Sequence, residues 1–191
     1  TGPSIWSLTE TNLHLQENLR QAVGRMSQEL HGSGFDKDNV AQFTLSDGAG
    51  VNGTDIVRFS IPVVCHNGDN IMDGSGNIAH WGAPLTWGCS SYTCMDANDN
   101  CTTVEYKSIE YRVGANNQLL RRVLDPANSV VREETFANNI VDFQVTLSAN
   151  QRVMTLNVTA QRVLLTTQLS TASTTIEVYL RNRGGRCAQH V

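Results

Sequence analysis

Charged residues are scarce in this sequence, at 17% of 191 residues, against roughly a quarter in a typical soluble domain. Lysine occurs only at Lys37 and Lys107, and the formal net charge is −4. Proteins that bind nucleic acid through phosphate contacts need a basic surface, so we expect no nucleic-acid partner. The sequence also contains no apolar run of the ~18 residues that a membrane-spanning helix requires.

The sequence motifs of the common enzyme classes are missing as well. There is no Gly-x-Ser-x-Gly elbow, no phosphate-binding Gly-x4-Gly-Lys loop and no His-Glu-x2-His pair. Cys65, His66, Asp69 and His80 are the one set of residues that could form a catalytic or metal-binding cluster. Solvated loop histidines are the simpler interpretation of this set. Because no nucleophile with a neighbouring base can be recognised, we predict that the chain is not an enzyme.

The five cysteines contain no Cys-x2-Cys pair, which excludes the spacing of a zinc ribbon. They are Cys65, Cys89, Cys94, Cys101 and Cys187. Disulfides formed in an oxidising compartment are favoured over a Cys/His metal site, and the odd count leaves one thiol over, for which Cys187 is the candidate.

We predict at least one disulfide among Cys65, Cys89, Cys94 and Cys101, because these cysteines are dense in a segment with little periodic structure. Cys94 could pair with either Cys89 or Cys101, and spacing alone does not choose between them. Peptide mapping without reductant should recover at least one cross-linked pair. Four free thiols would contradict the prediction and favour the metal site instead.

An acidic loop follows Cys94 and is a candidate calcium site. It places four oxygen-bearing side chains in five residues, namely Asp96, Asn98, Asp99 and Asn100. Calcium prefers several carboxylate and carbonyl oxygens in a flexible loop, and residues 69–77 are similar in composition. Neither stretch has the spacing of an EF-hand, and Asn and Asp are also common turn residues. Calcium is therefore the one cofactor that the sequence suggests, with ordinary turns as the alternative.

The first thirty residues predict an amphipathic helix. One apolar stripe recurs at a period of 3.6 residues and consists of Leu15, Leu19, Ala22, Val23, Met26 and Leu30. Polar residues, Glu29 among them, fall mostly off this stripe. The helix is expected to end at His31-Gly32, since glycine just past the last periodic residue is a common stop signal. The residues before Leu13 share no narrow face and are expected to project from the body.

After the helix, apolar residues alternate with polar ones, which predicts β-strands. Strands are expected at 41–45, 55–61, 106–113, 118–124, 130–134, 141–147, 154–160 and 176–181. Short turns between the later strands indicate hairpins, and hence an antiparallel sheet with one solvated face. Periodicity is lost between residues 64 and 103, where four of the cysteines lie. The predicted fold class is α+β, a long N-terminal helix packed on an antiparallel sheet with a long Cys-rich loop insertion.

The helix from Leu15 to Phe35 is similar to one in the PilW-like minor pilins of type IV pili and the J-type minor pseudopilins of type II secretion. Further similar motifs follow in the same order along the chain, at 109–113, 118–122, 134–143 and 178–182. The resemblance covers about three quarters of the chain, and the segment between Cys65 and Cys101 is not part of it.

The resemblance implies a pilin-like single domain, with residues 1–34 as the soluble half of a spine helix and residues 35–191 as the globular head, including the insertion at 64–103. It also implies a preceding leader and apolar helix that are absent from this sequence. Its partners would be other minor and major pilins or pseudopilins and the inner-membrane assembly machinery. The protein would lie at the periplasmic face of the inner membrane and in an extracellular filament, where it would help to initiate and cap assembly. The alternative is an extracytoplasmic adhesion or ligand-binding module that uses the Cys-rich insertion.

Overall fold

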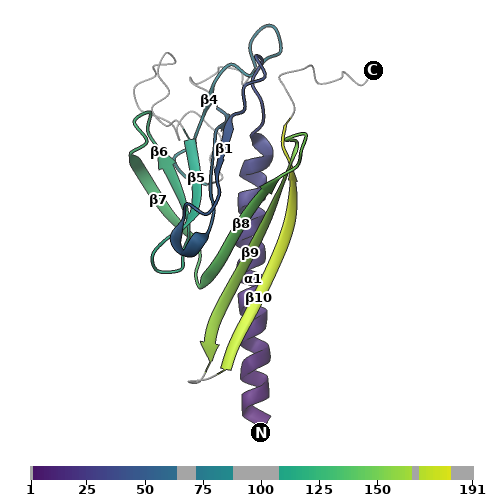
Figure 1. Ribbon diagram of the computed structural model, residues 1–191, viewed down its shortest axis with the longest axis vertical. Helices are drawn as coiled ribbons and strands as arrows, with labels where there is room; N and C mark the ends of the chain where they lie inside the picture. Colours follow the sequence, from purple (N-terminus) through teal and green to yellow (C-terminus); the bar gives the residue numbers. More distant parts are fainter. Residues whose placement is uncertain (1, 64–71, 88–107, 165–167, 182–191) are drawn as a thin grey trace.

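The computed structural model describes the backbone of residues 2–63, 72–87, 108–164 and 168–181, and the side chains of these residues except 2–8, 164 and 168. Helix α1 (Gly2–Gly32) runs along the length of the molecule, and the strands lie beside it (Figure 1). The N-terminal turns of α1 extend beyond the near ends of the last two strands.

The predicted fold class is wrong. The described part of the chain is mostly β-sheet with one N-terminal helix, and its strands form three antiparallel sheets instead of one. The five-stranded sheet has the order β1-β2-β5-β6-β7. Its strands are β1 (Phe43–Ser46), β2 (Ile56–Phe59), β5 (Ser108–Val113), β6 (Leu119–Leu124) and β7 (Val130–Ala137).

The three-stranded sheet has the order β10-β9-β8. It consists of β8 (Ile140–Leu147), β9 (Val153–Leu164) and β10 (Gln168–Tyr179). Strands β3 (Ile61–Pro62) and β4 (Trp81–Gly82) make the third sheet, and a 3-10 turn, η1 (Val51–Gly53), precedes β2.

The division into separate sheets arises at the short connection between β7 and β8. A two-residue link of this kind suggests a hairpin, but β7 and β8 belong to different sheets. Asn139 has a positive φ of 62°, and its carbonyl accepts the N–H of Gln161 in β9 at 2.8 Å. The N–H of Ile140 bonds to the Asn117 carbonyl at 2.7 Å. These contacts direct the chain from the five-stranded sheet into the three-stranded sheet. The apolar alternation within each strand does not indicate this change of sheet.

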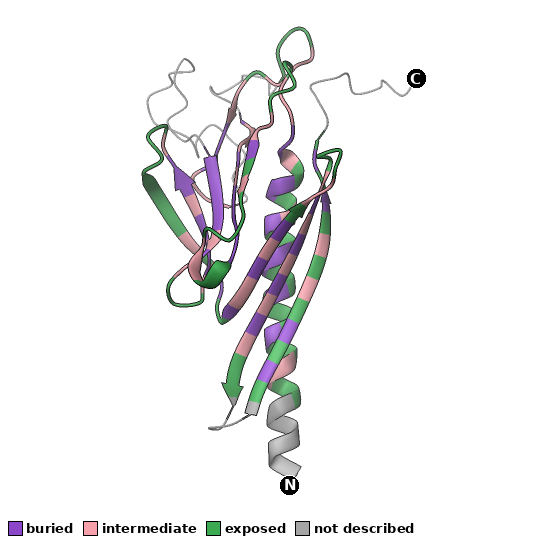
Figure 2. Cartoon of the chain, in the orientation of Figure 1, coloured by how far each residue is buried: buried purple, intermediate pink, exposed green. Residues whose placement is uncertain are grey.

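The buried face of α1 is the apolar stripe. Leu15, Leu19, Val23, Met26 and Leu30 are each 4% exposed or less, and they join one core with residues of both larger sheets. The helix lies mainly against β10 and β9, and in Figure 2 all three elements carry buried positions along the stretch where they run side by side. Burying such side chains supplies roughly 1.5–3 kcal/mol each, so the stripe holds helix and sheet together.

The C-terminal end of α1 is joined to the end of β10. Ser33 N–H closes the last turn on the Leu30 carbonyl at 2.9 Å, and Arg181 N–H bonds to the Ser33 carbonyl at 2.8 Å. At Gly34 a Cβ atom would stand 1.8 Å from the Arg181 carbonyl oxygen. Only glycine permits this close approach of two backbones, which explains why a glycine follows the helix here.

Three turns share one design, in which an aspartate begins the turn and caps it. Asp36, Asp73 and Asp125 each accept a backbone N–H from the residue four positions on, at 2.7–2.9 Å. Asn39, Gly76 and Asn128 take up the positive φ that these turns require. Asp73 lies in the second acidic stretch at 69–77, and its carboxylate is used in a turn, in the way that Asn and Asp commonly act.

Lowering the pH should loosen the turn at Asp73. The backbone N–H of Asn77 is the main cause that holds the pKa of the Asp73 carboxyl below its usual value. The pKa of Asp73 is therefore lower in the folded chain than in the unfolded chain. The ionised carboxylate stabilises the turn fully above the unfolded pKa, and this stabilisation is lost as the pH falls through the folded pKa. In an NMR titration the amides of Ser75 and Asn77 should shift together, with a midpoint below the ordinary aspartate value of about 3.9. A midpoint at or above that value, or the same shifts in Asp73→Asn, would contradict this assignment.

Candidate functional site

A buried ion pair joins α1 to the five-stranded sheet. Glu29 lies on α1 and Arg121 on β6, and they are 7% and 0% exposed. The Arg121 guanidinium donates from Nη2 to Glu29 Oε1 at 2.8 Å and from Nε to Oε2 at 3.0 Å. Two parallel bonds of this kind fix both the distance and the orientation of the partners. The pair therefore sets how the helix sits on the sheet.

Tyr111 on β5 completes this centre. Its hydroxyl donates to Glu29 Oε2 at 2.6 Å. Burial, helped by the charge of Glu29, raises the pKa of Tyr111 well above its usual value, so the hydroxyl keeps its proton and remains a donor. For Arg121, burial lowers the pKa and the hydrogen bond to Glu29 raises it, and the net shift is upward. Both carboxylate oxygens of Glu29 are thus held by donors from two neighbouring strands.

The same arginine holds the segment that follows β4. Its Nη2 donates to the Pro84 carbonyl at 2.9 Å and its Nη1 to the Leu85 carbonyl at 3.3 Å. Trp87 lies over α1, where its indole Nε1 donates to the Arg25 carbonyl at 3.2 Å and its ring lies 4.8 Å from the Arg25 guanidinium carbon. Arg121 therefore joins three parts of the chain, namely the helix, the sheet and residues 84–87.

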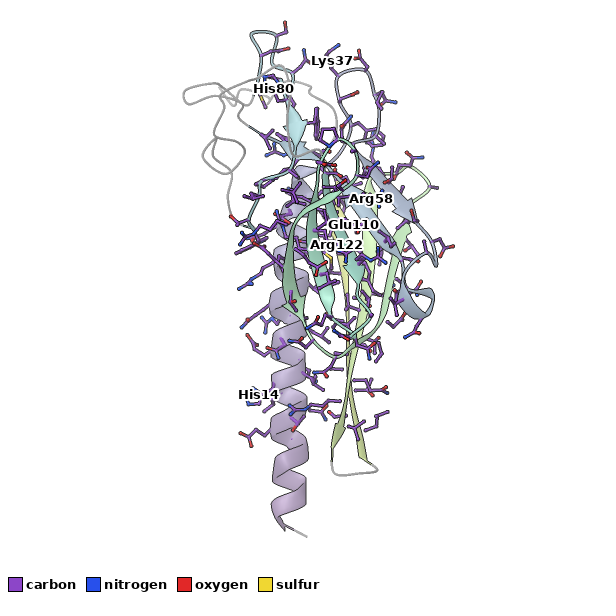
Figure 3. All side chains as sticks on the ribbon, turned by 90° about the vertical axis from the view of Figure 1, so that its left-hand side faces the viewer. His14, Lys37, Arg58, His80, Glu110 and Arg122 are labelled. Carbon is purple, nitrogen blue, oxygen red and sulfur yellow. The ribbon has the colours of Figure 1, made fainter. Side chains whose placement is uncertain are left out.

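A ladder of alternating charges crosses the opposite face of the five-stranded sheet. Arg58, Glu110, Arg122 and Glu133 stand directly opposite one another on β2, β5, β6 and β7. Glu110 is 1% exposed and accepts from Arg58 Nε at 2.6 Å, and Arg122 Nε donates to Glu133 at 2.6 Å. Figure 3 shows Arg58, Glu110 and Arg122 lying together on this face. Opposite charges in register stabilise the pairing of neighbouring strands.

Neither cluster has the make-up of a catalytic centre. Glu29 and Arg121 are enclosed and hold each other, and the described residues contain no group of three or more His, Cys, Asp or Glu side chains placed to hold a metal ion. His14 and His80 lie toward opposite ends of the molecule (Figure 3). The buried Glu29–Arg121 pair can instead fix α1 rigidly on the five-stranded sheet.

Most of the predicted site residues lie outside the described residues. Those positions are Cys65, His66, Asp69, Cys89, Cys94, Asp96, Asn98, Asp99, Asn100, Cys101 and Cys187. The disulfide, calcium and Cys/His interpretations therefore remain predictions, as does the adhesive role of the insertion at 64–103. His80, the described member of the Cys/His set, is partly buried. The five stripe residues of α1 lie in the core, as described above.

Sequence reasoning missed the Glu29–Arg121 pair because it assigned Glu29 to the polar side of the helix. The signal was nevertheless present in the strand. Arg121 falls between Leu119 and Val123 on the face of β6 that points to the core, and a charged residue there needs a buried partner. Glu29 follows Met26 by three residues, a spacing that places the two side chains side by side on a helix.

Comparisons with known proteins add no family assignment. No family model, no curated protein and no solved structure matches the chain. In the part of the chain that the structure describes, no helix is both long enough and apolar enough to span a membrane.

Proposed function

We propose that this protein is a structural minor subunit of a type IV pilus or of a type II secretion pseudopilus, and that it helps to initiate and cap filament assembly. The observation that carries the proposal is the division of α1 into a mostly exposed part, residues 9–14, and an anchored part that begins at Leu15. Thr9, Glu10, Leu13 and His14 are exposed, and Leu13, a large apolar residue, is 60% exposed. From Leu15 onward the apolar stripe is buried. This exposed part of α1 is accessible to another subunit, and Leu13 is the large apolar side chain on it.

The anchored part of α1 supports the same role. A helix that transmits contacts from one subunit to the next must not shift on its own sheet. The Glu29–Arg121 bonds and the buried stripe meet this requirement, since they fix α1 by directional and by apolar contacts. The proposed partners are other minor and major subunits, together with the inner-membrane assembly machinery. The proposed location is the periplasmic face of the inner membrane and the filament itself.

Deleting the gene in its native host tests this proposal. We expect the loss of surface filaments, or of type II secretion, and recovery when the wild-type gene is restored. The phenotype that is lost will also distinguish a pilus from a secretion system. A strain that keeps both activities after deletion would contradict the proposal.

Two matched variants make the test specific to the helix. Leu13→Glu places a charge on the exposed part of α1, whereas Tyr179→Glu places one at the end of β10. Both side chains are about equally exposed, at 60% and 62%, so neither change should unfold the domain. Leu13→Glu should fail to restore assembly at a normal protein level, and Tyr179→Glu should restore it. Full recovery with Leu13→Glu would exclude this part of the helix as a contact.

A further inference from the structure

A cavity of about 280 Å³ opens beside the charge ladder. Its described lining includes residues of β1 and β2, the first residue of β5 and the turn at Asn128. Arg58 is the one charged side chain among these described lining residues, and none of them is acidic. The other polar lining side chains include those of Gln42, Thr44, Ser108 and Asn128.

Arg58 is held in place at the wall of this cavity. Its Nε donates to the buried Glu110 carboxylate at 2.6 Å, and the guanidinium carries further N–H donors on its two Nη atoms. The side chain is 41% exposed, so these donors belong to a group that is fixed at one end and accessible at the other. A planar guanidinium held in this way is preorganised to bind a carboxylate through two bonds.

The charges around Glu110 do not balance. Arg112 and Arg122 each place Nη1 3.8 Å from Glu110 Oε1, and Arg122 also pairs with Glu133. Three arginines thus face two glutamates in this group, which leaves one positive charge in excess. In addition, Arg112 Nε is buried without a hydrogen-bond partner among the described residues. Arg58 is the one charged side chain among the described lining residues, and a single positive charge matches a monoanion better than a dianion such as phosphate.

We propose that this cavity binds a small monocarboxylate that carries hydroxyl groups, of the sugar-acid class. The carboxylate would lie against Arg58, and the hydroxyls would bond to the neutral side chains of Gln42, Thr44, Ser108 and Asn128. The volume is sufficient for one monosaccharide unit. This site is separate from the exposed part of α1, and it does not depend on the filament role.

NMR titration of the 191-residue chain with sodium glucuronate at constant ionic strength tests the site. The amides of Thr44 and Ser108 should shift with a dissociation constant in the millimolar range, on the order of 1–10 mM. Glucose, which lacks the charge, and inorganic phosphate should each bind at least about tenfold more weakly. No shift with glucuronate at ~50 mM, or equal binding of glucose, would overturn the proposal.

A pair of matched variants separates the cavity from general charge effects. Asn128→Asp introduces a negative charge into the lining, and Asn117→Asp makes the same change in the turn between β5 and β6, at the other end of these strands. Both asparagines have positive φ, 63° and 55°, and both donate their N–H to the carbonyl three residues earlier, so the two variants should fold alike. Asn128→Asp should weaken glucuronate binding by about tenfold or more, and Asn117→Asp should leave it unchanged. Equal binding by both variants would overturn the site.

Discussion

Replacing Arg121 with alanine should lower the free energy of unfolding by about 3–5 kcal/mol, the range seen when one partner of a buried ion pair is removed. The Glu29 carboxylate would stay buried, with the Tyr111 hydroxyl at 2.6 Å as its remaining described donor. The carbonyls of Pro84 and Leu85 would lose the donor that Arg121 supplies to them. Denaturation in urea, followed by circular dichroism, measures the loss.

Arg132→Ala is the matched control for this substitution. Arg132 also pairs with a glutamate, Glu134, at 3.0 Å, but its side chain is 47% exposed. Exposed pairs contribute only about 0–1 kcal/mol, so the control should be close to the wild type. The double variant Glu29→Gln with Arg121→Met should recover most of the lost stability, because it leaves no unpaired buried charge. Equally small losses of unfolding free energy in Arg121→Ala and Arg132→Ala would contradict the claim that the Glu29–Arg121 pair is a main contributor to stability.

Leu19→Ala and Met26→Ala should each cost about 2–5 kcal/mol, as expected when a buried side chain leaves a cavity. Both residues lie on the stripe of α1 and are at most 2% exposed. Leu13→Ala, six residues before Leu19 and 60% exposed, should change stability by no more than about 0.5 kcal/mol. The same denaturation experiment compares the three variants. Losses of similar size at all three positions would contradict the division of α1 into an exposed part and a buried stripe.

The helix and several strands could be read from the sequence because each has a local signal. The stripe from Leu15 to Leu30 has the helical period, and Gly32 marks the end of the helix, which the structure places at the same residue. Strand β6 begins one residue later than expected and ends where expected, at Leu124. Burial of one face produces the period in α1, whereas β6 is recognised by the apolar residues at both of its ends.

Strand β10 shows where this signal fails. The sequence predicts a strand only from Ile176, but β10 begins at Gln168. The segment Ser170 to Thr175 is almost entirely Ser, Thr and Ala, so it shows no clear alternation. Its position is set by unbroken pairing with β9, in which Ala172 lies opposite Ala160 and Ile176 opposite Leu156. Pairing with a distant strand is a property of the whole fold and is not visible in one segment.

The sheet arrangement and the buried centres depend on such distant contacts as well. Asp55 is 2% exposed and accepts the N–H groups of Gly48 at 2.8 Å and Val145 at 2.7 Å, so it ties the start of β2 to β8 in the other sheet. Nothing within a few residues of Asp55 indicates this role. Glu29 and Arg121 are likewise 92 positions apart in sequence, and only the assembled core brings them together.

Site-specific photo-crosslinking in the native host tests the central claim most directly. A photoreactive amino acid replaces Leu13 on the exposed part of α1 in the full-length protein, and Tyr179 in a control strain. Mass spectrometry then identifies the covalent adducts. We predict adducts from position 13 with other pilin or pseudopilin subunits, and far fewer from position 179. Adducts with no filament subunit from position 13, in cells that express the protein at its normal level, would contradict the proposal that this protein is a structural subunit.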